Sequence, residues 1–72
     1  MDRPGLLNLL VIAERHVLEG ARHIERQKQI IAELERDGHD ATTGHNTLAV
    51  FEEAQQLHIA DRDRLLKVLA AK

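Results

Sequence analysis

The sequence predicts an all-α protein, an antiparallel two-helix hairpin resembling a coiled coil that dimerises into a four-helix bundle. Helix-favouring residues dominate the 72 positions, with four glycines and one proline. Apolar residues recur at alternating steps of three and four, which is the spacing of one helix face. The chain is interrupted near its middle by Gly38. These features favour two helices of similar length in a single domain spanning residues 1–72.

The first helix is expected from about residue 4 to residue 37. Pro4 suits the first turn of a helix, where its missing N–H costs no hydrogen bond. Gly38 suits the left-handed residue that ends a helix. One face of this helix carries Leu10, Ala13, Val17, Gly20, Ile24, Gln27, Ile31 and Leu34.

A turn at 38–40 and a second helix from about residue 41 to residue 71 follow. Asp40 or Thr42 suits the N-cap of this helix, because a short oxygen-bearing side chain can accept from its free N–H groups. A short link folds two helices back on each other as an antiparallel pair. The inward face is expected to carry Leu48, Phe51, Gln55, His58, Arg62, Leu65 and Leu69.

Folding about Gly38 predicts which residues lie opposite each other. Residue numbers in the seam then sum to about 78 or 79, which places Ile31 against Leu48 and Gly20 against His58. On one flank of the seam the same reasoning places His16 opposite Asp61.

Composition excludes several classes of function. Ten basic residues against twelve acidic ones give a net charge of −2, far from the basic excess of a nucleic-acid-binding protein. There is no cysteine for thiol chemistry, and Phe51 is the only aromatic residue. No nucleophile with a neighbouring base and no glycine-rich phosphate loop can be placed, so we expect no enzymatic activity and no cofactor.

Membrane insertion is not expected either. The longest apolar stretch, Leu6–Ala13, is interrupted by Asn8 and is far shorter than the roughly 20 residues that span a bilayer. The residues around it do not form a secretory signal, so we expect a cytoplasmic protein that does not bind membranes.

The open end of the hairpin carries more apolar residues than one seam can bury. A helix that is apolar on most sides must be covered on more than one side, so we expect the chain to bind itself as a homodimer or larger oligomer. The expected dimer interface contains Leu6, Leu7, Leu9, Leu10, Val11, Ile12, Leu65, Leu66, Val68 and Leu69.

A polar cluster is predicted in the middle of the bundle. His16, His58 and Asp61 form either a hydrogen-bonded layer that sets register or a Zn²⁺-type metal site. Arg62 lies on the seam and is expected to form a buried ion pair with Glu14. A guanidinium beside a cation is unfavourable, which favours the structural layer.

Function is therefore expected to be that of a non-catalytic, self-associating hairpin that serves as a small scaffold or protein-interaction module. The alternative is a small metal-binding helical bundle that uses the His16, His58 and Asp61 cluster. A further protein partner is compatible with either hypothesis.

Several strings of the chain resemble short, uncharacterised helical-hairpin proteins found in bacteria. They are Gly20–Ile24, Gln27, Ile31–Asp40, Phe51–Glu52, His58 and Asp61–Leu65, within a likeness that covers about residues 13 to 69. The resemblance implies a hairpin of bacterial, cytoplasmic origin and no particular activity. Gly44 departs from the pattern, since such proteins have a better helix former there.

Overall fold

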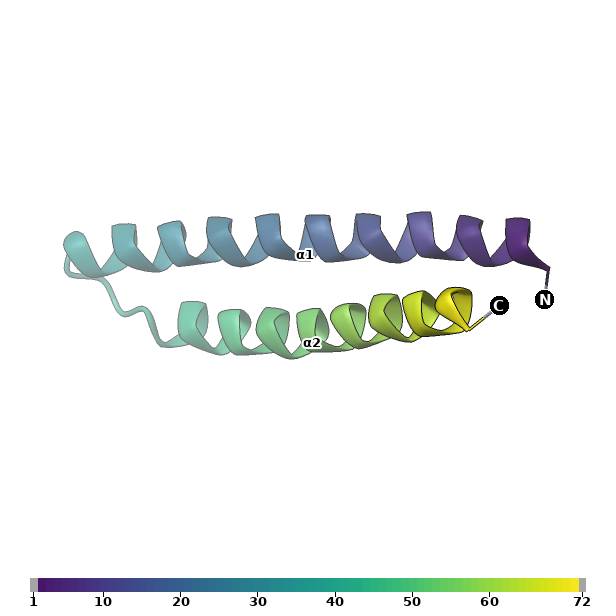
Figure 1. The fold of residues 1–72 in the computed structure, drawn as a ribbon. Coiled ribbons are helices and arrows are strands. Elements are labelled where there is room, and N and C mark those ends of the chain that lie inside the picture. Colours follow the sequence, from purple (N-terminus) through teal and green to yellow (C-terminus); the bar gives the residue numbers. More distant parts are fainter. Residues whose placement is uncertain (1, 72) are drawn as a thin grey trace.

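The computed structural model describes residues 2–71 and consists of two long helices joined by a short link (Figure 1). α1 spans Arg3–Arg36 and α2 spans Thr42–Ala70, so each helix end differs from its predicted position by one residue. The helices run antiparallel along a rod that measures 54 × 14 × 14 Å. Neither helix has an apolar run long enough to cross a bilayer within the described residues.

Local side-chain and glycine chemistry explains both ends of α1. Asp2 is the N-cap, and its carboxylate accepts a hydrogen bond from the Gly5 N–H at 3.0 Å. At the other end Gly38 has a φ of 75°, a conformation that costs glycine little. The His39 and Gly38 N–H groups donate to the carbonyls of Leu34 and Glu35, which is the Schellman arrangement expected of a glycine-terminated helix.

Asp40 stabilises the start of α2. Its carboxylate accepts from the Thr42 N–H at 2.9 Å and from the Thr42 hydroxyl at 2.6 Å. The side-chain hydrogen bond from Thr42, followed by the backbone one, lowers the pKa of Asp40 below its ordinary value. Ala41 is the residue at the cap position and is itself buried, so capping comes from its neighbour.

The register between the helices differs from the predicted one by about one helical turn. His16 lies against His58, with ring centroids 5.3 Å apart, and the His23 and Phe51 rings are 5.9 Å apart. Gly44 is buried against Ile31, which had been predicted opposite Leu48. These pairs sum to about 74 or 75, so the prediction of 78 or 79 was wrong.

Two glycines and their neighbours explain this register. At Gly20 the absent side chain leaves room for the Gln55 amide, and at Gly44 it leaves room for Ile31. Two helices approach closely where a small residue faces a large one. The link at 37–41 then runs back along the end of α1, which lets α2 begin beside residues that precede the last turn of α1 (Figure 1).

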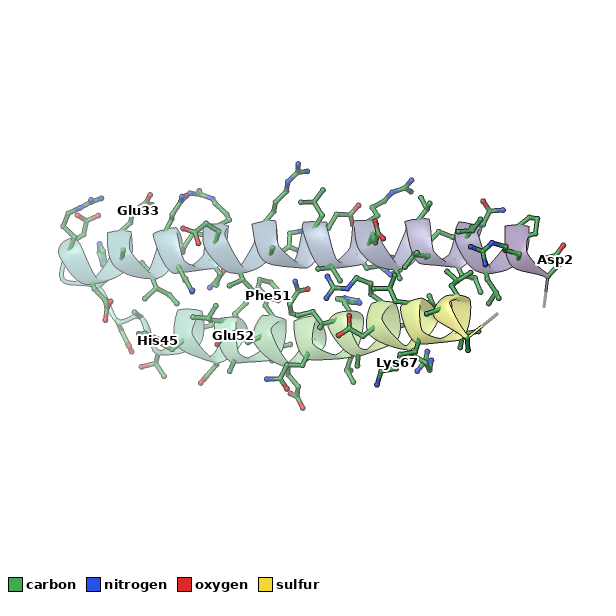
Figure 2. The ribbon with its side chains drawn as sticks, in the orientation of Figure 1. Asp2, Glu33, His45, Phe51, Glu52 and Lys67 are labelled. Carbon is green, nitrogen blue, oxygen red and sulfur yellow. The ribbon has the colours of Figure 1, made fainter. Side chains whose placement is uncertain are left out.

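The core between the helices is thin. Figure 2 shows Phe51 between the two ribbons, whereas Glu33 and Lys67 point away on opposite sides of the rod. No large side chain among residues 2–71 is fully buried. The buried hydrophobic residues are Leu6, Ala13, Ile31, Ala41 and Leu69.

Candidate functional site

The two histidines of the predicted polar cluster lie side by side. The rings of His16 on α1 and His58 on α2 are tilted by 48°, with centroids 5.3 Å apart. His16 is exposed and His58 is half-buried. His58 thus occupies the place opposite His16 that the sequence had predicted for Asp61.

Asp61 does not join the histidines. Its carboxylate accepts a hydrogen bond from Arg64 one turn along α2. Within residues 2–71 no three histidine, cysteine, aspartate or glutamate side chains are grouped so that they could hold a metal ion. A single chain therefore offers a metal ion the two imidazoles and no third side chain of these types.

Arg62 and Glu14 lie on the same side of the hairpin without forming the ion pair predicted within the chain. Arg62 donates to its neighbour Asp63 instead, with Nε and Nη2 each 3.0 Å from Oδ1. Its side chain is 32% exposed, and Glu14 is exposed. No charged residue is buried in the described part of the chain, so the prediction of a buried pair is wrong for the single hairpin.

A shallow groove runs between α1 and α2 on this side. Apolar atoms form most of its surface, with one acidic and one basic side chain among them. It is lined by Glu14, Val17, Leu18, Ala21, Arg62 and Leu66. Four of these residues come from α1 at spacings of three and four, which places them on one side of that helix.

The ten predicted interface residues divide into two groups. Leu6 and Leu69 are buried between the helices, and Leu10 and Leu65 are half-buried there. These four residues thus contribute to the seam of the single hairpin. The exposed members of the set are Leu7, Leu9, Val11, Ile12, Leu66 and Val68.

In the part of the chain that the structure describes, three further large apolar side chains are exposed and were not in the predicted set. Leu18 is 53% exposed, Val50 is 62% exposed and Leu57 is 70% exposed. Leu18 continues the spacing of Leu7 and Val11 along one side of α1, so the sequence pattern contained the signal. It was missed because the predicted surface was restricted to the two chain ends.

Comparison of the chain with protein-family models, with curated proteins and with solved structures finds no match in any of the three.

Proposed function

We propose that this chain is a non-catalytic, self-associating helical hairpin that dimerises into a four-helix bundle and serves as a small scaffold or protein-interaction module. The observation that carries the proposal is that more large apolar side chains are exposed to solvent than are buried between the helices. Among residues 2–71, nine large ones are exposed, whereas five hydrophobic residues are buried. Exposed apolar surface of this extent marks an interface with another molecule. A bacterial, cytoplasmic setting stays a prediction from the sequence.

The accessible area of the hairpin supports association. A compact monomer of 8.2 kDa exposes about 4,500 Å². The hairpin exposes 5319 Å², which is larger by about 800 Å². One partner in a stable interface of standard size buries about this area. A second copy packed along the rod would therefore give the chain the buried fraction of an ordinary small domain.

Sedimentation velocity tests the proposal directly. Measured over about a hundredfold range of concentration, the protein is expected to change from monomer to dimer, and its melting temperature to rise with concentration. A well-folded protein that stays monomeric, with a melting temperature independent of concentration, would contradict the proposal. Circular dichroism at each concentration separates that result from simple unfolding of the monomer.

A second candidate function is metal binding, favoured by the separation of His16 and His58. Two imidazole rings bound to one tetrahedral Zn²⁺ have centroids about 5 Å apart, given Zn–N distances of about 2.0–2.1 Å. The observed separation is 5.3 Å. The ion would bind both imidazoles, and water or a second copy of the chain would supply the other ligands.

Calorimetric titration of tag-free protein with Zn²⁺ tests this second candidate. Stoichiometric binding is expected, and His16→Ala is expected to abolish it. The matched control is His39→Ala, which removes an exposed histidine within the link between the helices and should leave binding unchanged. Equal loss in both variants would indicate nonspecific binding, and no heat of binding to the unsubstituted protein would also exclude the site.

A further inference from the structure

The groove and the apolar side chains that continue it form one stripe along the rod. On α1, Leu7, Val11, Glu14 and Leu18 lie within about 60° of each other around the helix axis. Leu66 lines the groove from α2. The stripe therefore extends from the open end of the hairpin to its middle. We call this side of the hairpin the groove face.

We infer that the groove face is where a second copy of this chain docks, and that Glu14 of each copy pairs there with the partner's Arg62. This inference rests on the proposed self-association and specifies its surface. The occupant is a second copy because the groove carries both halves of an ion pair. Glu14 comes from α1 and Arg62 from α2, and within one chain Arg62 bonds to Asp63 instead.

A two-fold interface repeats each contact, so that residue i meets the partner's j while j meets the partner's i. Two groove faces brought together in this way form two ion pairs between Glu14 and Arg62. Each guanidinium can then leave its own neighbour for the partner's carboxylate. Charges placed in this manner set the register and choice of partner in an otherwise apolar contact.

The side of the rod that carries the stripe is large enough for an interface. It is 54 Å long and 14 Å wide, an area of about 750 Å², and the stripe covers the part from the open end to the middle. Each partner contributes about 800 Å² to a standard stable interface. At the middle of this side Leu18 projects beside the smaller Ala21, and Leu18 is half exposed. A projecting residue beside a small one is the pattern of interdigitating helix surfaces.

The pairing of Glu14 on α1 with the partner's Arg62 on α2 also specifies how the second copy is oriented along the rod. With the two-fold axis parallel to the rod, each α1 lies against the partner's α2 at the same level, and Glu14 faces the partner's Arg62. Turning the partner end over end would set α1 against the partner's α1 and leave Glu14 without that arginine. In the first arrangement every neighbouring pair of helices is antiparallel, as in up-and-down four-helix bundles.

Charge reversal in separate copies tests the inference. Glu14→Arg and Arg62→Glu are prepared as two single variants. Alone, each places like charges at both symmetry-related contacts, so its dimer is expected to weaken at least ~100-fold. Mixed in equal amounts, the two variants restore an unlike pair at both contacts. The mixture is expected to form a heterodimer whose dissociation constant is within about tenfold of the unsubstituted protein.

Native mass spectrometry and sedimentation of the mixture provide the readout. If either variant alone loses its helices, recovery of helicity on mixing is the equivalent result. A pair formed within one chain cannot be restored by mixing, so a mixture that associates no better than its components overturns the inference. Single variants that dimerise as tightly as the unsubstituted protein overturn it as well.

Control variants reverse charges on the outer sides of the helices. Arg15→Glu and Glu53→Arg alter exposed residues about half a turn from the inward faces of α1 and α2. Both are expected to dimerise normally, and weakened dimers would trace the effect to net charge and overturn the inference.

If the unsubstituted protein is monomeric, the proposed function fails. If it dimerises and the mixture shows no recovery, the groove face alone is wrong.

Discussion

Gln55 of α2 donates a hydrogen bond from Nε2 to the carbonyl oxygen of Val17 on α1, at a distance of 2.8 Å. The same amide occupies the space that a side chain at position 20 would fill, because a methyl group on Gly20 would lie 2.8 Å from Gln55 Cδ. The amide oxygen is buried without a hydrogen-bond partner among the described residues. One amide and one glycine thus hold the middle of the hairpin in a single register.

Replacing Gly20 by alanine tests this relationship. In a helix interior, alanine is favoured over glycine by about 1 kcal/mol. With Gln55 present, the methyl group displaces the amide and removes one hydrogen bond, which offsets that gain by about 1 kcal/mol. We therefore expect Gly20→Ala to bring no gain in the unsubstituted protein and a gain of about 1 kcal/mol in a Gln55→Ala background.

Urea unfolding of the four proteins at one fixed concentration measures the coupling between Gly20 and Gln55. Fixing the concentration keeps association from entering the comparison. If Gly20→Ala changes the free energy of unfolding equally in both backgrounds, the two residues do not determine register as described here.

The register shows what the sequence could and could not predict. Helix-end signals are local, so Pro4, Gly38 and Asp40 marked the helix ends to within one residue. Heptad spacing marks the inward faces but leaves the offset between two helices open by whole turns. That offset depends on which glycine receives which side chain and on the path of the link. Gly20 was expected opposite His58, whereas the structure places it against Gln55.

Leu18→Ala tests whether apolar contact on the groove face drives association. A two-fold dimer buries this side chain twice, so losing about 1 kcal/mol at each copy weakens the dimer about 30-fold. Leu57→Ala is the matched control. Leu57 lies nine positions before Leu66 and therefore on the opposite side of α2, where it is 70% exposed.

Sedimentation equilibrium of the two variants gives their dimer dissociation constants. Leu57→Ala is expected to stay within about threefold of the unsubstituted protein, as surface substitutions do. Equal weakening by both substitutions would mean that association uses no particular side of the hairpin.

The lowered pKa of Asp40 predicts a specific acid sensitivity. A carboxyl group with a depressed folded-state pKa contributes stability above its unfolded value, and that contribution is lost as the pH falls through the folded value. The contribution comes from hydrogen bonds donated by Thr42 to the charged form. Asp40→Asn keeps an acceptor for the Thr42 N–H but removes the titrating charge near the start of α2.

Melting temperatures of the two proteins at about pH 6 and about pH 3 test this prediction. The unsubstituted protein is expected to be more stable than Asp40→Asn at the higher pH, and the difference is expected to shrink at the lower pH. Other carboxylates titrate in both proteins, so they cancel in the comparison. A difference that does not depend on pH would show that the charge of Asp40 does not stabilise α2.

The candidate site was predicted less completely than the helices. Apolar residues at the open end could be recognised from their number. Leu69 is buried, as its place on the predicted inward face requires, yet Leu6 is buried in the hairpin as well and was expected only at the dimer interface. Which leucines face inward depends on the rotation of each helix, and two apolar stripes on one helix leave that rotation ambiguous. Glu14 was expected within reach of Arg62, and both residues line the groove. Their expected pairing within one chain was wrong.

The direction of the docked copy gives the last prediction. If the two-fold axis is parallel to the rod, both turns lie at the same end of the dimer. The chain has no cysteine, so His39→Cys allows one nitroxide label to be attached at each turn. Helices in contact pack about 8–10 Å apart, so we expect the two labels to be separated by about 20–35 Å. An end-over-end dimer would separate them by nearly the 54 Å length of the rod.

A label at Asn8→Cys, near the open end, should again give a short distance between copies. Pulsed electron paramagnetic resonance on a mixture of the two labelled variants should give a long distance in the heterodimer. Long distances between identical labels, with a short one in the mixture, would show that the copies run in opposite directions and that Glu14 does not meet the partner's Arg62.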